Sequence, residues 1–156
     1  MFPVLSDPSL YLFLDSSPPE SVELLRERYA KLEAGVSPDG SQCWLNWIVV
    51  LPSEGPIGFV QATVVGTTAW VAYFLGKAHW SRGYATEATN AMLSHLCSVY
   101  ETSLFRATVE LANSRSIALL RGLGFGLAGS NDLGSRSLSP TECLFVKHAS
   151  SGSHGI

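Results

Sequence analysis

Two long stretches of the chain place apolar residues at the three- and four-residue spacing of an amphipathic helix. The first follows Ser17-Pro18-Pro19-Glu20, where the serine can cap a helix, the prolines fit its first turn and the glutamate completes a capping box. Its apolar positions are Val22, Leu25, Tyr29 and Leu32, and Gly35 is the stop signal. The second starts within 80–88, and its apolar positions are Ala85, Ala88, Met92, Leu93, Leu96, Val99 and Tyr100. A short third helix is predicted between Asn113, which can cap it, and Gly122.

β-Branched and aromatic residues dominate six other segments, which predicts a β-sheet. These segments are Trp44–Leu51, Ile57–Val65, Thr68–Leu75, Leu104–Leu111, Phe125–Ala128 and Glu142–His148. The two residues Gly66-Thr67 separate the second segment from the third, as in a hairpin of antiparallel strands. Because hairpins alternate with helical crossovers, we expect an α+β fold with a mixed, mostly antiparallel twisted sheet flanked by helices.

The 156 residues suit a single domain, which we place at residues 1–149, with a disordered tail at 150–156. Residues 1–16 are short apolar runs broken by prolines and aspartates, and no element is assigned to them. A net charge of -3 and the lack of any Lys/Arg run argue against a nucleic-acid partner. No apolar stretch approaches the roughly 20 residues of a membrane span, and the N-terminus lacks the basic start of a signal peptide.

Cysteine and histidine positions indicate neither a metal site nor a disulfide framework. The cysteines Cys43, Cys97 and Cys143 are odd in number and fit no ligand spacing, and the histidines are scattered. No Ser/His/Asp arrangement with a nucleophile elbow is present. We therefore expect a metal-free cytoplasmic protein with reduced cysteines.

The clearest chemistry lies between the strand 68–75 and the helix that follows it. Gly83 and Ala85 are small and Arg82 is cationic. N–H groups in the first turn of a helix hold anions together with the helix dipole, and small residues let a phosphate approach the backbone. An ordinary tight turn is the alternative. A Walker loop is excluded because no Gly-Lys-Ser/Thr follows, and a dinucleotide fingerprint would need more glycines.

Residues Trp80-Ser81-Arg82-Gly83-Tyr84-Ala85-Thr86-Glu87-Ala88 resemble the acetyl-CoA signature of the GNAT superfamily of N-acetyltransferases. The likeness is closest to the branch that acetylates the N-termini of ribosomal proteins. Gly83 and Ala85 match the small positions of the motif Arg/Gln-x-x-Gly-x-Gly/Ala, and Trp80 stands where Arg or Gln is common. A second motif agrees, because Asn113-Ser114-Arg115-Ser116 through Leu123-Gly124-Phe125 is similar to the family's Asn-x-x-Ser…Gly-Phe segment.

The resemblance implies the GNAT (acyl-CoA N-acyltransferase) fold, with acetyl-CoA as co-substrate and no metal. In that fold the strand at Tyr73-Phe74-Leu75 splays from the strand at 106–110, and pantetheine pairs with the exposed edge. A backbone N–H near Phe74 or Leu75 would polarise the thioester carbonyl. The implied pyrophosphate ligands are the backbone amides of Arg82, Gly83, Tyr84, Ala85 and Thr86. The side chains implied to contact the pantetheine arm are Asn113 and Ser116, with a pure helix cap as the alternative for the asparagine.

The implied reaction is direct attack of a neutral primary amine on the acetyl thioester in a ternary complex. The acceptor is then a peptide N-terminus or a small-molecule amine. Many family members place a tyrosine acid at the position of Leu120, which cannot donate a proton, so Tyr73 is a candidate hydroxyl beside Ser116 and Tyr84. Glu110, on the polar face of its strand, is the first choice of base, with a solvated carboxylate as the alternative. Without an obvious buried base, amines of low pKa suit the enzyme better than lysine side chains.

The acceptor pocket has weaker candidates. Trp47 and Gln61 alternate along the strands next to the predicted cleft, together with Trp44, Asn46 and Trp70. For the tryptophans, core packing is the alternative.

Two further expectations concern the sheet edge and rival functions. Family members usually begin with a strand before the first helices, so either Ser9–Leu14 is that strand or it is absent. Its absence would leave a bare edge that favours a homodimer. The rival functions are a catalytically weak acyl-CoA-binding module, acting as a sensor or partner subunit, and transfer of a longer acyl group.

Overall fold

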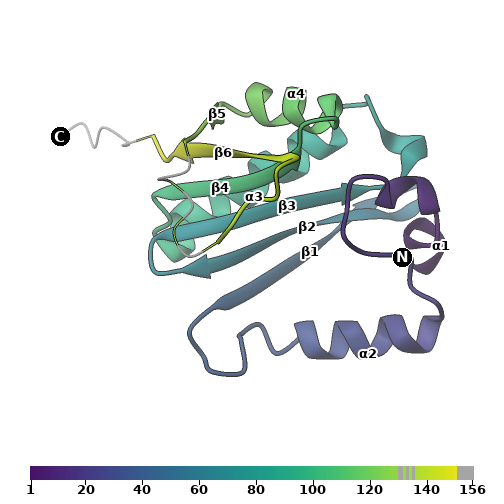
Figure 1. Ribbon diagram of the computed structural model, residues 1–156. Coiled ribbons are helices and arrows are strands. Elements are labelled where there is room, and N and C mark those ends of the chain that lie inside the picture. The colour runs from purple at the N-terminus through teal and green to yellow at the C-terminus, as the bar shows by residue number, and fades with distance from the viewer. Residues whose placement is uncertain (130–131, 133, 135, 151–156) are drawn as a thin grey trace.

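The computed structural model describes residues 1–129, 132, 134 and 136–150, so most of the predicted tail lies outside the described residues. Its centre is a six-stranded sheet in the order β1-β2-β3-β4-β6-β5, flanked by helices (Figure 1). Neighbouring strands are antiparallel except β3 and β4, which are parallel. The strands are β1 (Cys43–Leu51), β2 (Gly55–Val65), β3 (Thr68–Leu75), β4 (Leu104–Glu110), β5 (Gly126–Leu127) and β6 (Glu142–His148). The helices are α1 (Phe2–Leu5), α2 (Val22–Leu32), α3 (Tyr84–Tyr100) and α4 (Ser114–Gly122), with 3-10 turns η1 (Pro8–Tyr11) and η2 (Lys77–His79). The expected mixed, mostly antiparallel sheet is confirmed.

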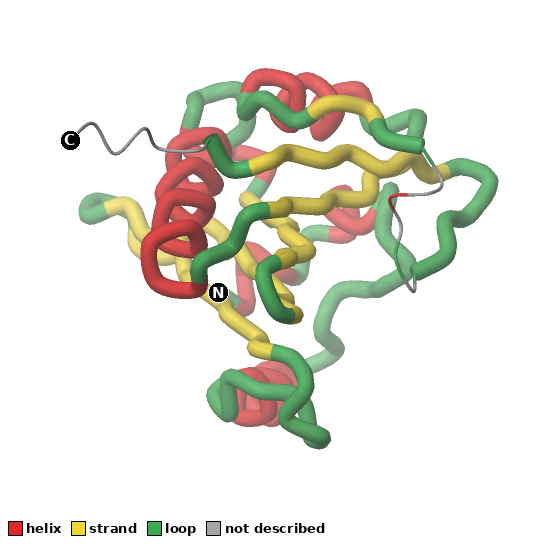
Figure 2. The backbone as a smooth tube through the Cα atoms, turned by 90° about the vertical axis from the view of Figure 1, so that its left-hand side faces the viewer, coloured by secondary structure: helices red, strands yellow, loops and turns green. Residues whose placement is uncertain are grey.

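Helix α2 begins at Val22, after the two prolines, and not at Ser17 as its sequence pattern predicts. Ser21 is the N-cap, and its Oγ accepts a hydrogen bond from the backbone N–H of Leu24 at 3.2 Å. A residue that precedes a proline is driven to extended backbone, which applies to both Ser17 and Pro18. The helix therefore starts only once the prolines are passed. Figures 1 and 2 show α2 set apart from the other helices, beyond β1.

Residues 1–16 form helical turns and no strand. Prolines occupy the first turns of α1 and η1, and the Asp7 carboxylate accepts a hydrogen bond from the Ser9 N–H at 2.9 Å. Because Pro8–Tyr11 is a 3-10 turn, Ser9–Leu14 is not the strand that opens the sheet. Strand β1 is consequently an edge of the described sheet, and pairing of this edge with a second copy stays a prediction.

Helix α3 packs against one face of the sheet and forms the core with it. Its fully buried residues are Thr89, Met92, Leu93 and Leu96. Met92, Leu93 and Leu96 belong with sheet residues such as Phe105 and Phe145 to one apolar cluster. Two residues that the apolar pattern predicts to be buried lie outside that cluster. These are Val99 and Leu111, and each is 58% exposed. The helix turns Tyr100 toward the core in place of Val99, and β4 ends before Leu111.

Strands β3 and β4 diverge after a short parallel contact. They pair only where Thr68–Trp70 meets Leu104–Arg106. Strand β3 nevertheless continues to Leu75 and β4 to Glu110. On the side that faces β4, the backbone of β3 beyond Trp70 therefore has no neighbouring strand in the described structure. This gap in the sheet positions the site.

The backbone that borders the gap is held in place by Gly58, which lies opposite Leu75 in the ladder between β2 and β3. A Cβ at Gly58 would collide with the Phe74 carbonyl oxygen and lie 2.8 Å from the Leu75 Cα. Both are backbone atoms, so the strands would have to separate. We expect Gly58→Ala to lower the free energy of unfolding by about 3 kcal/mol, measured by urea denaturation.

The matched control for this change is Gly122→Ala, because a Cβ at Gly122 meets nothing within 4 Å. Gly122 ends α4, and alanine is the better helix former, so this variant should be as stable as the parent or slightly more stable. Equal losses of stability in the two variants would contradict the proposed backbone collision.

Candidate active site

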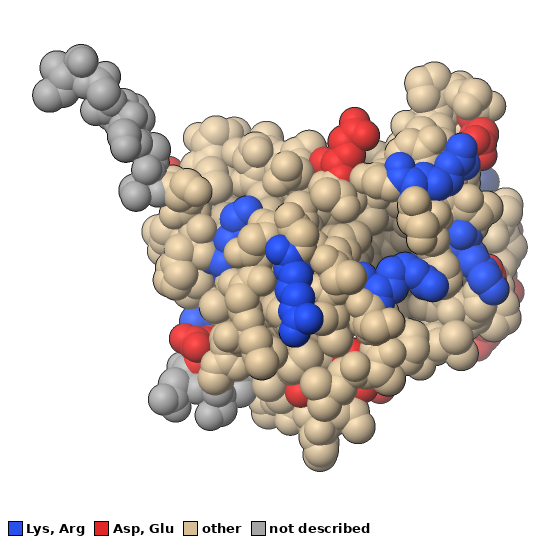
Figure 3. Space-filling model, turned by 90° about the horizontal axis from the view of Figure 1, so that it is seen from above, with Lys and Arg blue, Asp and Glu red and all other residues tan. Residues whose placement is uncertain are grey.

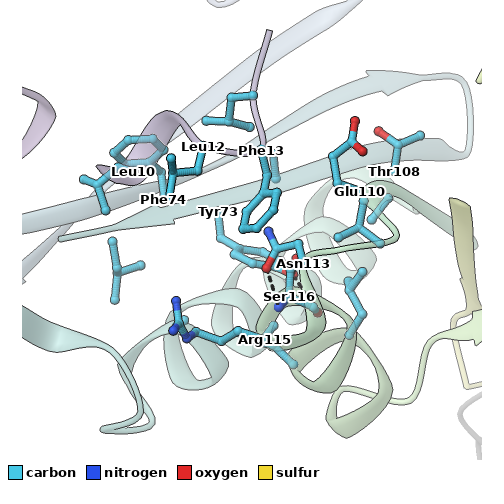
Figure 4. A pocket seen from close by; sticks show the side chains of 18 of the residues that line it. Leu10, Leu12, Phe13, Tyr73, Phe74, Thr108, Glu110, Asn113, Arg115 and Ser116 are labelled. Carbon is cyan, nitrogen blue, oxygen red and sulfur yellow. Dashed lines mark hydrogen bonds between the residues drawn. The ribbon is translucent and has the colours of Figure 1, made fainter. Parts of the chain in front are cut away.

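A cavity of about 410 Å³ opens where β3 and β4 diverge (Figure 4). Its walls come from these two strands, from the starts of α3 and α4, and from residues within 9–15. The predicted site residues that line it are Tyr73, Phe74, Leu75, Ala85, Glu110, Asn113 and Ser116. Residues far apart in the sequence thus meet in one cavity of a size that suits a small-molecule ligand.

Trp47 and Gln61 do not line this cavity, contrary to the sequence expectation. The ring of Trp47 lies edge-on to His95 of α3 at 5.7 Å, and it borders a separate cavity of about 560 Å³ beside β1. Side chains alternate along a strand, and the alternation turns Trp47 toward the helix. Gln61 pairs across the ladder with Ala72, which lines the cleft, but Gln61 itself does not.

Helix α3 begins at a turn that leaves its first N–H groups free. Gly83 is the N-cap with a φ of 84°, a left-handed conformation that favours glycine, and the described residues offer no side-chain cap. The Glu87 N–H donates to the Gly83 carbonyl at 3.0 Å. The preceding N–H groups, from Tyr84 to Thr86, have no partner among the described residues. Unpaired N–H groups at a helix start are able to bind an anion, and Ala85 among these residues lines the cleft.

Trp80 and Arg115 form the wall between the starts of the two helices. The Trp80 indole N–H donates to the Leu75 carbonyl at 2.8 Å, and the Arg115 guanidinium lies 3.8 Å from the centre of the indole ring. Arg82 lies 5.4 Å from the centre of the Tyr84 ring. Figure 3 shows Lys and Arg side chains beside a hollow on the face seen from above. Sequence reasoning gave Arg115 no role, although it lies within the second motif.

Asn113, Ser116 and Tyr73 form a hydrogen-bonded group on the floor of the cavity. The Asn113 side-chain oxygen accepts from the Ser116 N–H at 3.1 Å, which confirms the predicted helix cap. The Tyr73 hydroxyl lies 2.6 Å from the Ser116 Oγ and donates to the Ser116 carbonyl at 3.2 Å. Burial raises the pKa of Tyr73 to about 12, against a smaller lowering by the hydrogen bond with Ser116. Tyr73 is therefore a neutral phenol at pH 7.

Carboxylates lie at the other side of the cavity. Glu110 and Glu142 stand opposite each other across β4 and β6, and both line the cavity with Asp15. One Glu142 oxygen accepts from the Ser139 N–H at 2.9 Å. The sequence indicated Glu110 by its place on the polar face of the strand where the sheet splays, but it gave no role to Glu142 or Asp15. Their approach depends on the strand pairing and on the path of the N-terminal segment.

The cleft offers backbone N–H groups, carboxylates, hydroxyls and guanidinium groups. Among the described residues, no set of His, Cys, Asp and Glu side chains is arranged to hold a metal ion, and all three cysteines are free. None of the described helices is long and apolar enough to cross a membrane.

Comparison with known proteins places this chain in a family. The family described as acetyltransferase (GNAT) domain matches residues 1–126. A Bacillus licheniformis protein named "Uncharacterized N-acetyltransferase p20" is 28% identical over 126 residues, which are 80% of this chain and 70% of that protein. The narrower likeness to the ribosomal-protein branch stays a prediction.

Solved structures share the fold. A GNAT-family acetyltransferase from Bacillus anthracis superposes with a TM-score of 0.73 at 16% identity, over 95% of this chain and 86% of that one. The spermidine N-acetyltransferase from Vibrio cholerae, in complex with CoA and spermine, gives a TM-score of 0.69 at 16% identity, over 93% and 84% of the two chains. With the family match over most of its length, the chain belongs to the GNAT acetyltransferases.

Proposed function

We propose that this acetyltransferase moves the acetyl group of acetyl-CoA to a primary amine, by direct attack of the amine within a ternary complex. The observation that carries the proposal is the cavity in the gap of the sheet, which runs from the uncapped start of α3 to Glu110. Acetyl-CoA supplies an activated thioester and a thiol leaving group. The residues of the chain bind and orient acetyl-CoA. They also accept a proton from the amine and donate a proton to the thiolate.

The start of α3 is chemically suited to the pyrophosphate of the cofactor. Free N–H groups from Tyr84 to Thr86 and the helix dipole attract an anion, and Arg82 and Arg115 add positive charge nearby. The methyl side chain of Ala85 leaves the backbone accessible. Along the gap, β3 beyond Trp70 has no strand partner on the side of β4, so the backbone groups that remain free there can pair with the amides of pantetheine, whereas the Leu75 carbonyl already accepts from Trp80.

Glu110 is the proposed base. Its side chain points into the cavity from the end of β4, close to Thr108 (Figure 4). A carboxylate there can take a proton from the ammonium form of the acceptor, directly or through one water. Attack requires the neutral amine, so this proton transfer is needed at neutral pH.

Tyr73 is the proposed acid, because the family's usual position for a tyrosine holds the buried Leu120. Both residues line the same cavity. Tyr73 carries its proton at neutral pH and can donate it to the leaving thiolate, although burial, which raises its pKa, makes it a weaker acid than an exposed tyrosine. Its hydrogen bonds to Ser116 hold the ring across the gap.

Amines of low pKa suit this arrangement. An α-amino group with a pKa near 7.7–8.0 is roughly a tenth neutral at pH 7, whereas a lysine near 10.4 is far less so. Peptide N-termini, those of ribosomal proteins included, and small-molecule amines are the acceptors in question. The structural neighbour whose structure contains spermine supports a small-molecule amine.

The test is thiol release from acetyl-CoA with a panel of primary amines, for the parent and for Glu110→Gln. We expect Glu110→Gln to lower kcat/KM by about a hundredfold at pH 7. The deficit should narrow as the pH approaches the pKa of the amine, because the amine then arrives already neutral. A structural role of Glu110 would give a loss that does not depend on pH.

Glu23→Gln serves as the control, since Glu23 lies in the first turn of α2 and outside the cavity. It should leave kcat/KM unchanged. Binding of coenzyme A without thiol release from any amine would favour the rival function, a binding module without catalysis.

A further inference from the structure

Leu12, Phe13 and Leu14 expose apolar side chains at the cavity. They are 74%, 40% and 47% exposed, and all three line the cavity. Figure 4 shows Phe13 directed toward Tyr73 and Asn113. Three consecutive exposed apolar residues contribute little to folding, and such a patch at a cleft commonly marks a surface that binds a ligand.

Aromatic packing holds this segment over the cavity. The ring of Tyr11 lies 5.4 Å from that of Phe74, which in turn stacks on Phe59 at 5.3 Å. The Tyr11 hydroxyl donates to the Leu5 carbonyl at 2.9 Å. Phe74 itself borders the cavity, so the apolar segment that follows Tyr11 is fixed to the same wall as the proposed thioester site.

Three carboxylates, those of Asp15, Glu110 and Glu142, line the cavity. Glu110 and Glu142 lie directly opposite each other in the ladder, an arrangement of like charges that destabilises a sheet. Within the described part of the chain, no Lys or Arg forms a salt bridge with either of them or with Asp15. An ammonium group placed between the two glutamates would remove this repulsion.

We infer that the acceptor is a primary monoamine with an apolar body attached within a few bonds of its nitrogen. The ammonium group lies against Glu110 and Glu142, and the apolar body packs on Leu12, Phe13 and Leu14. The inference rests on the proposed function, because it places the acceptor in the same cavity. A polyamine fits less well, since its second charge would lose water against an apolar wall.

The test measures thiol release from acetyl-CoA with three acceptors: 2-phenylethylamine, a tripeptide that begins with phenylalanine, and spermidine. At least one of the first two should exceed spermidine in kcat/KM by about tenfold or more. The better of the two shows whether the apolar amine is a small molecule or a peptide α-amine. Phe13→Asp should lower kcat/KM for that acceptor by about tenfold and leave the value for spermidine equal or higher.

The matched control is Val65→Asp, because Val65 is 46% exposed and lies at the far end of the β2–β3 hairpin. Val65→Asp should leave kcat/KM unchanged for both the apolar amine and spermidine. Titration with coenzyme A verifies that Phe13→Asp is folded. Spermidine as the best acceptor, or an equal loss for all acceptors in Phe13→Asp, would overturn this inference and leave the proposed function standing. Absence of thiol release with every amine would overturn both.

Discussion

Replacing Ala85 by glutamate is expected to weaken the binding of coenzyme A by about a hundredfold or more. Ala85 lines the cavity in the first turn of α3, where the free N–H groups would meet the pyrophosphate. A carboxylate there brings like charge next to the phosphates and fills the space they need. Isothermal titration with coenzyme A measures the change in Kd.

The fold should tolerate this substitution. An acidic side chain in the first turn of a helix stabilises it by about 0.3–1 kcal/mol, so Ala85→Glu should unfold no more easily than the parent. Ala91→Glu is the matched control, since Ala91 is exposed on the same helix and does not line the cavity. An unchanged Kd for Ala85→Glu would mean that the start of α3 does not hold the cofactor.

Tyr73→Phe is expected to lower kcat by about ten- to a hundredfold while the Kd for coenzyme A changes little. The substitution keeps the ring that crosses the gap and removes only the proton donor. The effect falls below that of a typical general acid because a thiol with a pKa near 8.5 is already a fair leaving group. Steady-state thiol release and titration with coenzyme A separate the two quantities.

The pH dependence of the free energy of unfolding gives a second measurement on the Tyr73 hydroxyl. The pKa of Tyr73 rises from 10.0 to about 12 on folding, so its contribution to stability is complete below pH 10 and is lost as the pH rises through 12. The stability of Tyr73→Phe should lack this decline. Tyr29→Phe is the control for kcat, because Tyr29 lies on α2 and does not line the cavity, and this variant should keep the kcat of the parent. Equal kcat in the parent and Tyr73→Phe would remove Tyr73 from the chemistry.

The local structure of the proposed cofactor side could be predicted because short stretches of sequence encode it. Gly83 adopts a positive φ at the turn that predicts an anion site, and Asn113 caps the helix that its position predicts. Glu110 and Tyr73 reach one cavity because their strands end at the gap, as the family resemblance implied.

The acceptor side could not be predicted in the same way. Alternation along a strand divides residues between two faces but does not say which face meets the cleft, and Trp47 proved to face α3. Residues 12–15 reach the cavity only because Tyr11 packs on Phe74, a contact between segments far apart in the sequence. Pro18 and Pro19 similarly delayed the start of α2 through an effect on the residues before them.

The short paired segment between β3 and β4 affects how the width of the gap is set. Few ladder bonds join the two halves of the sheet, so their spacing depends on the apolar layer beneath, where Val71 of one half and Ala107 of the other share a cluster with Leu96 of α3. The two halves of the sheet are therefore held together mainly by side-chain packing on one face, and this packing sets the width of the gap between β3 and β4. Substitutions in this apolar layer would therefore change which acyl carriers and amines fit the gap, although the substituted residues contact neither ligand. The same substitutions would change thermal stability, so stability and selectivity would vary together.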